Sequence, residues 1–141
     1  GHGDFEEQQN KIQACIQNLG YKTEYWNYAE QFVSDIYPKC AGDIDCDLEE
    51  STKLMDSVGI NSKAVLICVD KDGESLLEAD YNKAKEVGVT GSPTLVINGA
   101  KASVSRTAEA YKQAICSAYE NAPATCETEL DSTGSTASGN C

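Results

Sequence analysis

The chain has 141 residues, of which 40% are hydrophobic, and this suits one domain with a core of ordinary size. Its 11 basic and 23 acidic residues give a formal net charge of -12, which repels phosphate backbones and anionic lipid surfaces. We therefore expect no nucleic-acid partner. We also expect no membrane contact from this chain, because no apolar run reaches the roughly 18 residues of a membrane-spanning helix.

The first three residues, Gly1-His2-Gly3, are interpreted as a cloning remnant rather than as part of the domain. His2 is the only histidine of the chain. Setting it aside removes Ser-His and Cys-His catalytic pairs and histidine-containing zinc sites from the candidate chemistries. We expect no metal, no cofactor and no catalytic residue within this chain.

Two helices are predicted in the first 40 residues. The first carries an apolar face before the stop at Gly20, and the second starts with Thr23 as its cap and ends where Pro38 forbids continuation. Trp26 and Tyr28 widen the aromatic face of the second helix, and we interpret that face as packing surface. The two apolar faces are Ile12, Cys15, Ile16 and Leu19, and Tyr25, Ala29, Phe32 and Ile36.

A third helix is predicted after residue 46, where Asp47 and Glu50 have the spacing of a capping box, and it ends at Gly59. The stretch 63–69 leaves two structures open. Its β-branched composition and the following Asp72-Gly73 favour a strand with a hairpin turn. Asn61 as a helix cap and apolar residues at helical spacing up to residue 87 favour a helix instead.

After Val89 the sequence pattern changes from one typical of helices to one typical of a β-hairpin. Residues 94–97 form a short apolar run, and Asn98-Gly99 is a strong two-residue hairpin signal, so residues 100–104 should pair back as a second strand. Thr107 then caps a final helix that turns Tyr111, Ala114, Ile115 and Ala118 inward and ends at Asn121-Ala-Pro123. We expect the free edge of the first strand to pair with another copy or to be covered by a helix.

Seven cysteines in so short a chain favour an oxidising compartment. Zinc binding is disfavoured because the tightest spacing is five intervening residues. We expect three structural disulfides, Cys15–Cys40, Cys46–Cys68 and Cys116–Cys126, although the spacing allows other pairings. Cys141 is left over at the end of a small, polar segment.

The run from Val87 to Gly99, Val-Gly-Val-Thr-Gly-Ser-Pro-Thr-Leu-Val-Ile-Asn-Gly, resembles the cis-proline segment of DsbA-like thiol–disulfide oxidoreductases of exported microbial type. Residues 106–116 are similar to the closing helix of that family. The resemblance implies an α/β thioredoxin-like fold, here incomplete, in which a helix-rich insertion precedes one β-hairpin and a C-terminal helix. It also implies that residues 62–69 are helical. Ser92, Pro93 and Thr94 would face an extended polypeptide substrate that contains cysteine. A plain turn that enters a strand is the alternative.

The resemblance divides the chain into four parts: the remnant 1–3, a helical insertion region 4–88, the hairpin and closing helix 89–127, and a flexible polar tail 128–141. The family's reactive C-x-x-C motif follows a first strand in an initial β-α-β unit, and the 141 residues contain no such motif. We expect that the missing unit, or a second copy of the chain, completes the site, unless the motif has been lost.

Three functions remain open. The chain is part of an extracytoplasmic oxidoreductase or isomerase, a redox-inactive peptide-binding module, or a disulfide-stapled structural domain.

Overall fold

The structure is a computed structural model that describes residues 3–134. Gly1 and His2 of the expected remnant, and residues 135–141 of the expected tail with Cys141, lie outside the described residues. The chain divides into two units, Gly1–Asn82 and Lys83–Cys141. Each unit is described by itself below.

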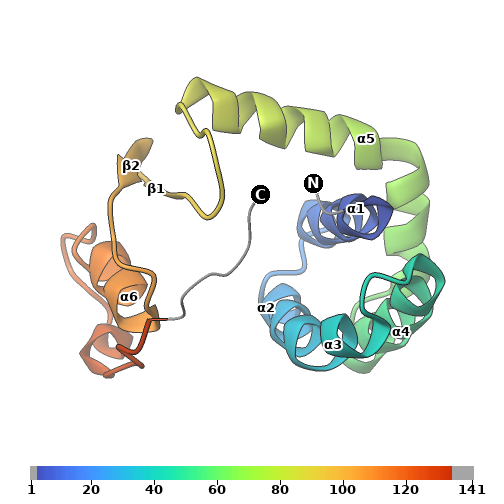
Figure 1. Ribbon diagram of the computed structural model, residues 1–141, viewed down its shortest axis with the longest axis horizontal. Helices are drawn as coiled ribbons and strands as arrows, with labels where there is room; N and C mark the ends of the chain where they lie inside the picture. Colours follow the sequence, from blue (N-terminus) through green and yellow to red (C-terminus); the bar gives the residue numbers. More distant parts are fainter. Residues whose placement is uncertain (1–2, 135–141) are drawn as a thin grey trace. The chain divides into compact units, whose positions relative to one another are not determined.

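The first unit is helical (Figure 1). It contains α1 (Asp4–Asn18), α2 (Thr23–Gln31), α3 (Tyr37–Cys40), α4 (Ile44–Ser57) and most of α5 (Ser62–Glu86), with a π-helical turn over Phe32–Ile36. Every described residue that is buried belongs to this unit. Its hydrophobic core consists of Ile12, Cys15, Ile16, Tyr28, Phe32, Ile36, Cys40, Met55, Ile60, Val65 and Cys68.

The predicted apolar face of α1 is confirmed for Ile12, Cys15 and Ile16, which are fully buried. Leu19 is an exception, because α1 ends at Asn18 and leaves this side chain 44% exposed. Gly20 follows with φ +90°, a conformation that a side chain disfavours. The helix therefore ends where the sequence predicted.

The predicted second helix is longer than expected. Lys22 rather than Thr23 occupies the cap position, and the chain stays helical beyond Pro38 to Cys40. Pro38 is tolerated because it lies in the first turn of α3, where a backbone N–H needs no helical partner. The preceding π-helical turn lets the chain change its hydrogen-bond register before the proline. Tyr28 is fully buried as predicted, whereas Trp26 is 70% exposed and contacts only the edge of the Tyr25 ring among the described aromatic rings, with centroids 5.2 Å apart.

The start of α4 is set by Asp43, not by the predicted box of Asp47 and Glu50. The Asp43 Oδ1 atom accepts hydrogen bonds from the backbone N–H groups of Asp45 (3.1 Å) and Cys46 (2.9 Å). Asp43 has the extended backbone of a cap residue, so α4 is capped four residues earlier than predicted and begins at Ile44. The carboxylates of Asp47 and Glu50 are consequently available for other partners.

The ambiguous stretch 63–69 is helical and forms the start of α5. Asn61 caps this helix as predicted, because its Oδ1 atom accepts a hydrogen bond from Ala64 N–H over 3.0 Å. The hairpin signal Asp72-Gly73 is wrong. Gly73 is buried inside α5, and a β-carbon there would lie 3.3 Å from Cβ of Lys11 in α1, so the glycine permits close packing of two helices. None of the described helices is long and apolar enough to cross a membrane.

The second unit contains the predicted β-hairpin (Figure 1). Strands β1 (Leu95–Ile97) and β2 (Ala100–Ala102) pair antiparallel, with Leu95 opposite Ala102 and Ile97 opposite Ala100. Asn98 and Gly99 have φ values of 50° and 80°, as the two central residues of a type I′ turn require. The second strand is two residues shorter than predicted. Within residues 3–134 the sheet has no third strand, and the partner of the other edge of β1 stays a prediction.

The closing helix α6 (Ala108–Cys116) is capped by Thr107, whose Oγ1 atom accepts a hydrogen bond from Ala110 N–H over 3.0 Å. The inward packing predicted for this helix is wrong for Ile115 and Ala118, which are exposed, while Tyr111 and Ala114 are half-buried. The reason is that the second unit offers no buried core within the described residues. A 3₁₀ turn (Ala124–Glu127) follows.

Residues 128–131 do not behave as the expected free tail. They are hydrogen-bonded to α6 and are called the strap below. The Lys112 ammonium donates to the Thr128 carbonyl (2.6 Å), and the Glu109 backbone N–H donates to the Asp131 carbonyl (3.1 Å). The Leu130 N–H donates to the Glu109 carboxylate (2.8 Å). Part of the expected tail is thus hydrogen-bonded to α6.

Candidate functional site

The turn from Gly91 to Thr94 joins the segment after α5 to strand β1. Ser92, Pro93 and Thr94 are all exposed, and the Ser92–Pro93 peptide bond is cis. The Thr94 hydroxyl donates a hydrogen bond to the Gly91 carbonyl, which closes the turn on itself. The three residues that the sequence assigned to substrate contact thus lie together at the surface, next to the start of a strand.

Strand β1 has one edge that no described strand covers. Ile97 and Ala100 flank the two-residue turn and so form a hydrogen-bonded pair, and the alternation of an antiparallel ladder then directs the backbone N–H and C=O of Val96 away from β2. The corresponding outer edge of β2 carries Lys101, whose ammonium donates to the Gly88 carbonyl over 2.9 Å. A lysine protects a sheet edge from further pairing, and β1 has no such residue. The β1 edge can therefore accept an extended polypeptide.

The disulfides form in the structure between all six described cysteines, but two of the predicted pairs are wrong. Cys15 bonds to Cys68, with Cα atoms 5.8 Å apart, and Cys40 bonds to Cys46, with Cα atoms 5.5 Å apart. Cys15 and Cys68 lie on buried faces of α1 and α5, so helix packing brings together cysteines that are 53 residues apart.

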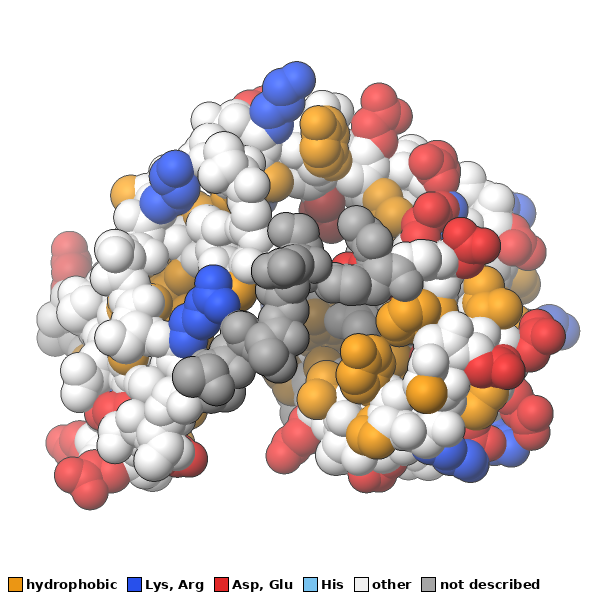
Figure 2. Space-filling model, in the orientation of Figure 1, with side chains coloured by type: hydrophobic (Ala, Val, Ile, Leu, Met, Phe, Trp, Pro, Cys, Tyr) orange, Lys and Arg blue, Asp and Glu red, His pale blue; other side chains and the backbone are white. Residues whose placement is uncertain are grey.

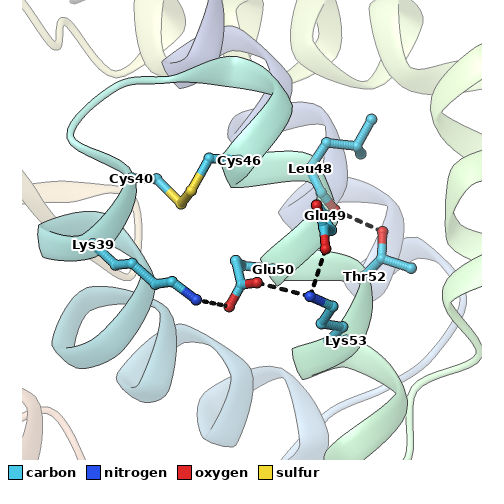
Figure 3. Close-up of polar contacts among 8 residues, drawn as sticks. All are labelled: Lys39, Cys40, Cys46, Leu48, Glu49, Glu50, Thr52 and Lys53. Atoms are coloured by element: carbon cyan, nitrogen blue, oxygen red, sulfur yellow. Dashed lines mark hydrogen bonds and ion pairs between the residues drawn. A yellow bond between two sulfur atoms is a disulfide. The ribbon is translucent and has the colours of Figure 1, made fainter.

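Cys40 and Cys46 can pair because the chain between them reverses sharply at Ala41 (φ 50°) and Gly42 (φ 89°). Figure 3 shows this disulfide linking the end of α3 to the first turn of α4. The third bond joins Cys116 to Cys126, as the sequence predicted, and it fixes the 3₁₀ turn to the end of α6. All three bonds hold secondary-structure elements together.

A chain of surface ion pairs lies beside the Cys40–Cys46 bond (Figure 3). The Glu50 carboxylate accepts hydrogen bonds from the ammonium groups of Lys39 (2.6 Å) and Lys53 (2.9 Å), and these hold the pKa of Glu50 below its usual value. Lys53 also pairs with Glu49 (2.6 Å). Exposed pairs of this kind contribute little to stability, and these groups lie at the surface rather than in the enclosed setting of an acid–base catalyst.

Sequence reasoning missed a buried polar cluster in the first unit. The Gln9 amide donates from Nε2 to Asp47 Oδ2 (2.6 Å) and to Ser51 Oγ (2.8 Å), and the Tyr28 hydroxyl donates to Gln9 Oε1 (2.8 Å). All four side chains are at most 4% exposed. Burial raises the pKa of Tyr28 to about 12 and raises that of Asp47 above its ordinary value.

A signal for this cluster was present in the sequence. Gln9 lies three residues before Ile12 and seven before Ile16, on the same helical face. Asp47, Ser51 and Met55 follow one another at intervals of four residues, so they also share a helical face. Polar residues on an apolar face predict buried hydrogen-bonded groups. The cluster crosslinks α1, α2 and α4, and we assign it to structure rather than catalysis.

The described cysteines supply no free thiol, since all six are in disulfides. Among residues 3–134 no group of three or more histidine, cysteine, aspartate or glutamate residues is placed to hold a metal ion. What the arrangement offers is an exposed turn and an open strand edge, which are features for binding polypeptide.

A family model described as Thioredoxin matches residues 3–116, from the start of the described chain to the last residue of α6. No curated protein and no solved structure matches the chain.

Proposed function

This chain belongs to the thioredoxin family, and from that membership we propose that it is the substrate-binding part of a DsbA-like thiol–disulfide oxidoreductase or isomerase. The predicted fold class is confirmed: the domain is thioredoxin-like and helix-rich, with a two-stranded antiparallel sheet and a C-terminal helix. The observation that carries the proposal is the exposed turn at Ser92, Pro93 and Thr94, which lies within the matched residues.

The proposed site of action is extracytoplasmic. Three disulfides among residues 3–134 are compatible with an oxidising compartment, because reducing conditions in the cytosol disfavour such bonds. The proposed substrates are therefore exported polypeptides that contain cysteine.

The proposed role of the turn is to hold an extended substrate segment beside strand β1. Two features support it: the turn is exposed, and the outward amide groups of Val96 leave hydrogen-bonding capacity for a further strand. Main-chain pairing of this kind tolerates many substrate sequences, which suits an enzyme that acts on many exported proteins.

The reactive dithiol of the proposed enzyme comes from outside the 141 residues. Dithiol exchange needs a nucleophilic cysteine beside a resolving cysteine, usually as C-x-x-C, and the sequence has no such motif. We propose a β-α-β unit, or a second copy of the chain, as the partner that completes the site. The assignment of residues 4–88 to a helical insertion and 89–127 to the hairpin and closing helix is part of this proposal.

Peptide binding tests the proposed role of the turn. A fluorescent, extended peptide whose cysteine has been alkylated is titrated with the 141-residue chain, and anisotropy reports the dissociation constant. Ser92→Glu places a charge in the proposed contact and should weaken binding about tenfold, equivalent to about 1.4 kcal/mol.

Ser103→Glu is the matched control, since Ser103 is also exposed in the same unit and lies outside the turn. It should leave the dissociation constant unchanged. Equal effects of the two substitutions, or none from either, would show that the turn does not contact the peptide.

A redox-inactive peptide-binding module is the second candidate. It is favoured by the pairing of every described cysteine in a disulfide that links structural elements. Both candidates predict peptide binding. They differ in whether a C-x-x-C partner, added to the chain, produces exchange with the bound peptide.

A further inference from the structure

Charge is distributed unevenly along the chain. Residues 83–108 carry four basic residues and one acidic residue, Glu86, which gives a formal charge of +3 in a chain whose net charge is -12. This segment contains the end of α5, the turn at Ser92–Thr94 and the β-hairpin. The turn therefore lies in a basic part of an acidic protein. The four basic residues are Lys83, Lys85, Lys101 and Arg106.

These four basic side chains are exposed, and none of them pairs with a carboxylate within residues 3–134. The first acidic residue after the segment, Glu109, is paired with Lys112 over 2.8 Å. Lys101 donates to the Gly88 carbonyl, and this neutral acceptor leaves the charge of the ammonium in place. Figure 2 shows Lys and Arg side chains on the visible face of the second unit. Their positive charge is therefore available to a bound ligand.

Hydrogen bonds bring these charges close to the turn. The Lys101 ammonium donates to the Gly88 carbonyl over 2.9 Å, and the Gly88 N–H donates to the Lys85 carbonyl over 3.0 Å. The hairpin is thus held at the last turn of α5, which also contains Lys83. Gly91 begins the Ser-Pro turn three positions after Gly88, and three residues span at most about 11 Å. The Lys101 ammonium and the basic end of α5 therefore lie close to the turn.

We propose that the polypeptide bound at this turn is acidic: a segment with aspartate or glutamate on both sides of the residues that contact Ser92–Thr94. The inference rests on the function proposed above and names the class of substrate that the same site selects. It uses the charges of the basic segment, on which the proposed contact at the turn does not depend.

The local charge and the net charge of the chain act on an acidic substrate in opposite directions. The basic segment attracts the substrate, whereas the net charge of -12 repels it. Salt decides between the two effects, because at about 0.1 M the Debye length is about 10 Å and only nearby charges are felt. At such ionic strength the basic residues next to the turn select the substrate.

Three labelled peptides test the preference by anisotropy with the 141-residue chain. They share an uncharged, extended core with one alkylated cysteine, and each end carries a pair of glutamates, glutamines or lysines. Two unit charges about 10 Å apart in water change a dissociation constant about twofold. Because the acidic and basic peptides differ in the sign of every flanking charge, the acidic one should bind at least about tenfold more tightly at about 0.1 M salt. At about 1 M salt the Debye length is about 3 Å, and the difference should vanish.

Substitutions on α5 separate local charge from net charge. Lys83→Gln/Lys85→Gln removes two positive charges near the turn and should reduce the preference for the acidic over the basic peptide at least about threefold. Lys63→Gln/Lys71→Gln is the matched control: both of its lysines are also exposed on α5 and it changes the net charge equally, but they lie in the other unit. It should leave the preference unchanged. Lys101→Gln keeps a side-chain hydrogen-bond donor and should also reduce the preference.

The glutamine peptide separates this inference from the proposed function, and circular dichroism shows whether each variant keeps its fold. If Ser92→Glu weakens binding of the glutamine peptide while all three peptides bind the parent equally, the proposed function stands and the charge selection is overturned. Tighter binding of the basic peptide would overturn it too. So would an equal loss of preference in the two double variants, since the net charge would then be responsible. Binding of none of the three peptides would refute the proposed function, and the charge selection with it.

Discussion

The Nε2 atom of Gln9 donates a 2.6 Å hydrogen bond to Oδ2 of Asp47, although the two residues lie 38 positions apart in the sequence. Both side chains are buried, and the bond joins α1 to α4. Asp47 is thus a buried carboxylate whose described hydrogen bond comes from a neutral amide. Burial without a cationic partner raises its pKa, which links the stability of the first unit to pH.

The first prediction concerns Asp47→Asn. A raised pKa in the folded protein means that Asp47 stabilises the fold most at pH values below its unfolded pKa and loses that contribution as pH rises through its folded pKa. Asparagine still accepts the Gln9 hydrogen bond but does not ionise. The variant should be at least as stable as the parent at pH 7, and the difference in unfolding free energy should grow as pH rises from about 4.

Urea denaturation at several pH values measures this difference. Asp47→Ala is the contrasting variant, because it leaves the buried Gln9 amide without this acceptor and should cost about 1–3 kcal/mol. A parallel pH dependence in the parent and in Asp47→Asn would show that Asp47 is ionised without penalty.

The second prediction compares two disulfides. In the chain-entropy description, a bond that closes a longer loop restricts the unfolded chain more strongly. The Cys15–Cys68 bond spans 53 residues and Cys40–Cys46 spans 6. Replacing both cysteines by alanine should cost about 4 kcal/mol for the first bond and about 2 kcal/mol for the second. Chemical denaturation under non-reducing conditions gives both values, and the reverse order would contradict the description.

The third prediction concerns Glu109 and the strap. The Lys112 ammonium and then the Leu130 N–H hold the pKa of Glu109 at about 2, below the ordinary 4.5. A lowered pKa means that the carboxylate stabilises the strap above pH 4.5 and that this contribution is lost as pH falls toward 2. The hydrogen-exchange protection factor of the Leu130 amide should fall over that range.

Glu109→Gln is the control for this effect. Its amide oxygen can still accept from Leu130 N–H, but it carries no charge to titrate, so the protection factor should vary little with pH. Constant protection of Leu130 in the parent down to pH 2 would mean that other contacts hold the strap.

The fourth prediction is that the 141-residue chain alone does not catalyse insulin reduction by a small thiol. The six described cysteines are bonded in pairs, and the sequence contains no C-x-x-C. Turbidity should develop at the rate of the reductant alone, both for the parent and for Cys141→Ser. Faster turbidity that persists in Cys141→Ser would show that one of the assigned structural disulfides is reactive, and faster turbidity in the parent alone would implicate Cys141.

The sequence by itself determined the local features. Asn98-Gly99 predicted the hairpin, and Asn61 and Thr107 predicted two helix starts, because turn and cap preferences act between residues that are neighbours in the chain. The segment containing Ser92–Thr94 indicated a thioredoxin-like fold, and the family match confirms that much. Such signals need no knowledge of the rest of the fold.

Only the tertiary structure decided the contacts between distant segments. The pairing of Cys15 with Cys68, the bond between Gln9 and Asp47 and the burial of Gly73 against α1 depend on how helices pack, and packing is not encoded in any short pattern. The exposure of apolar side chains on α6 has the same origin. Ile115 has the spacing of a core residue, and its exposure became known only when the structure showed that no described part of its unit covers it.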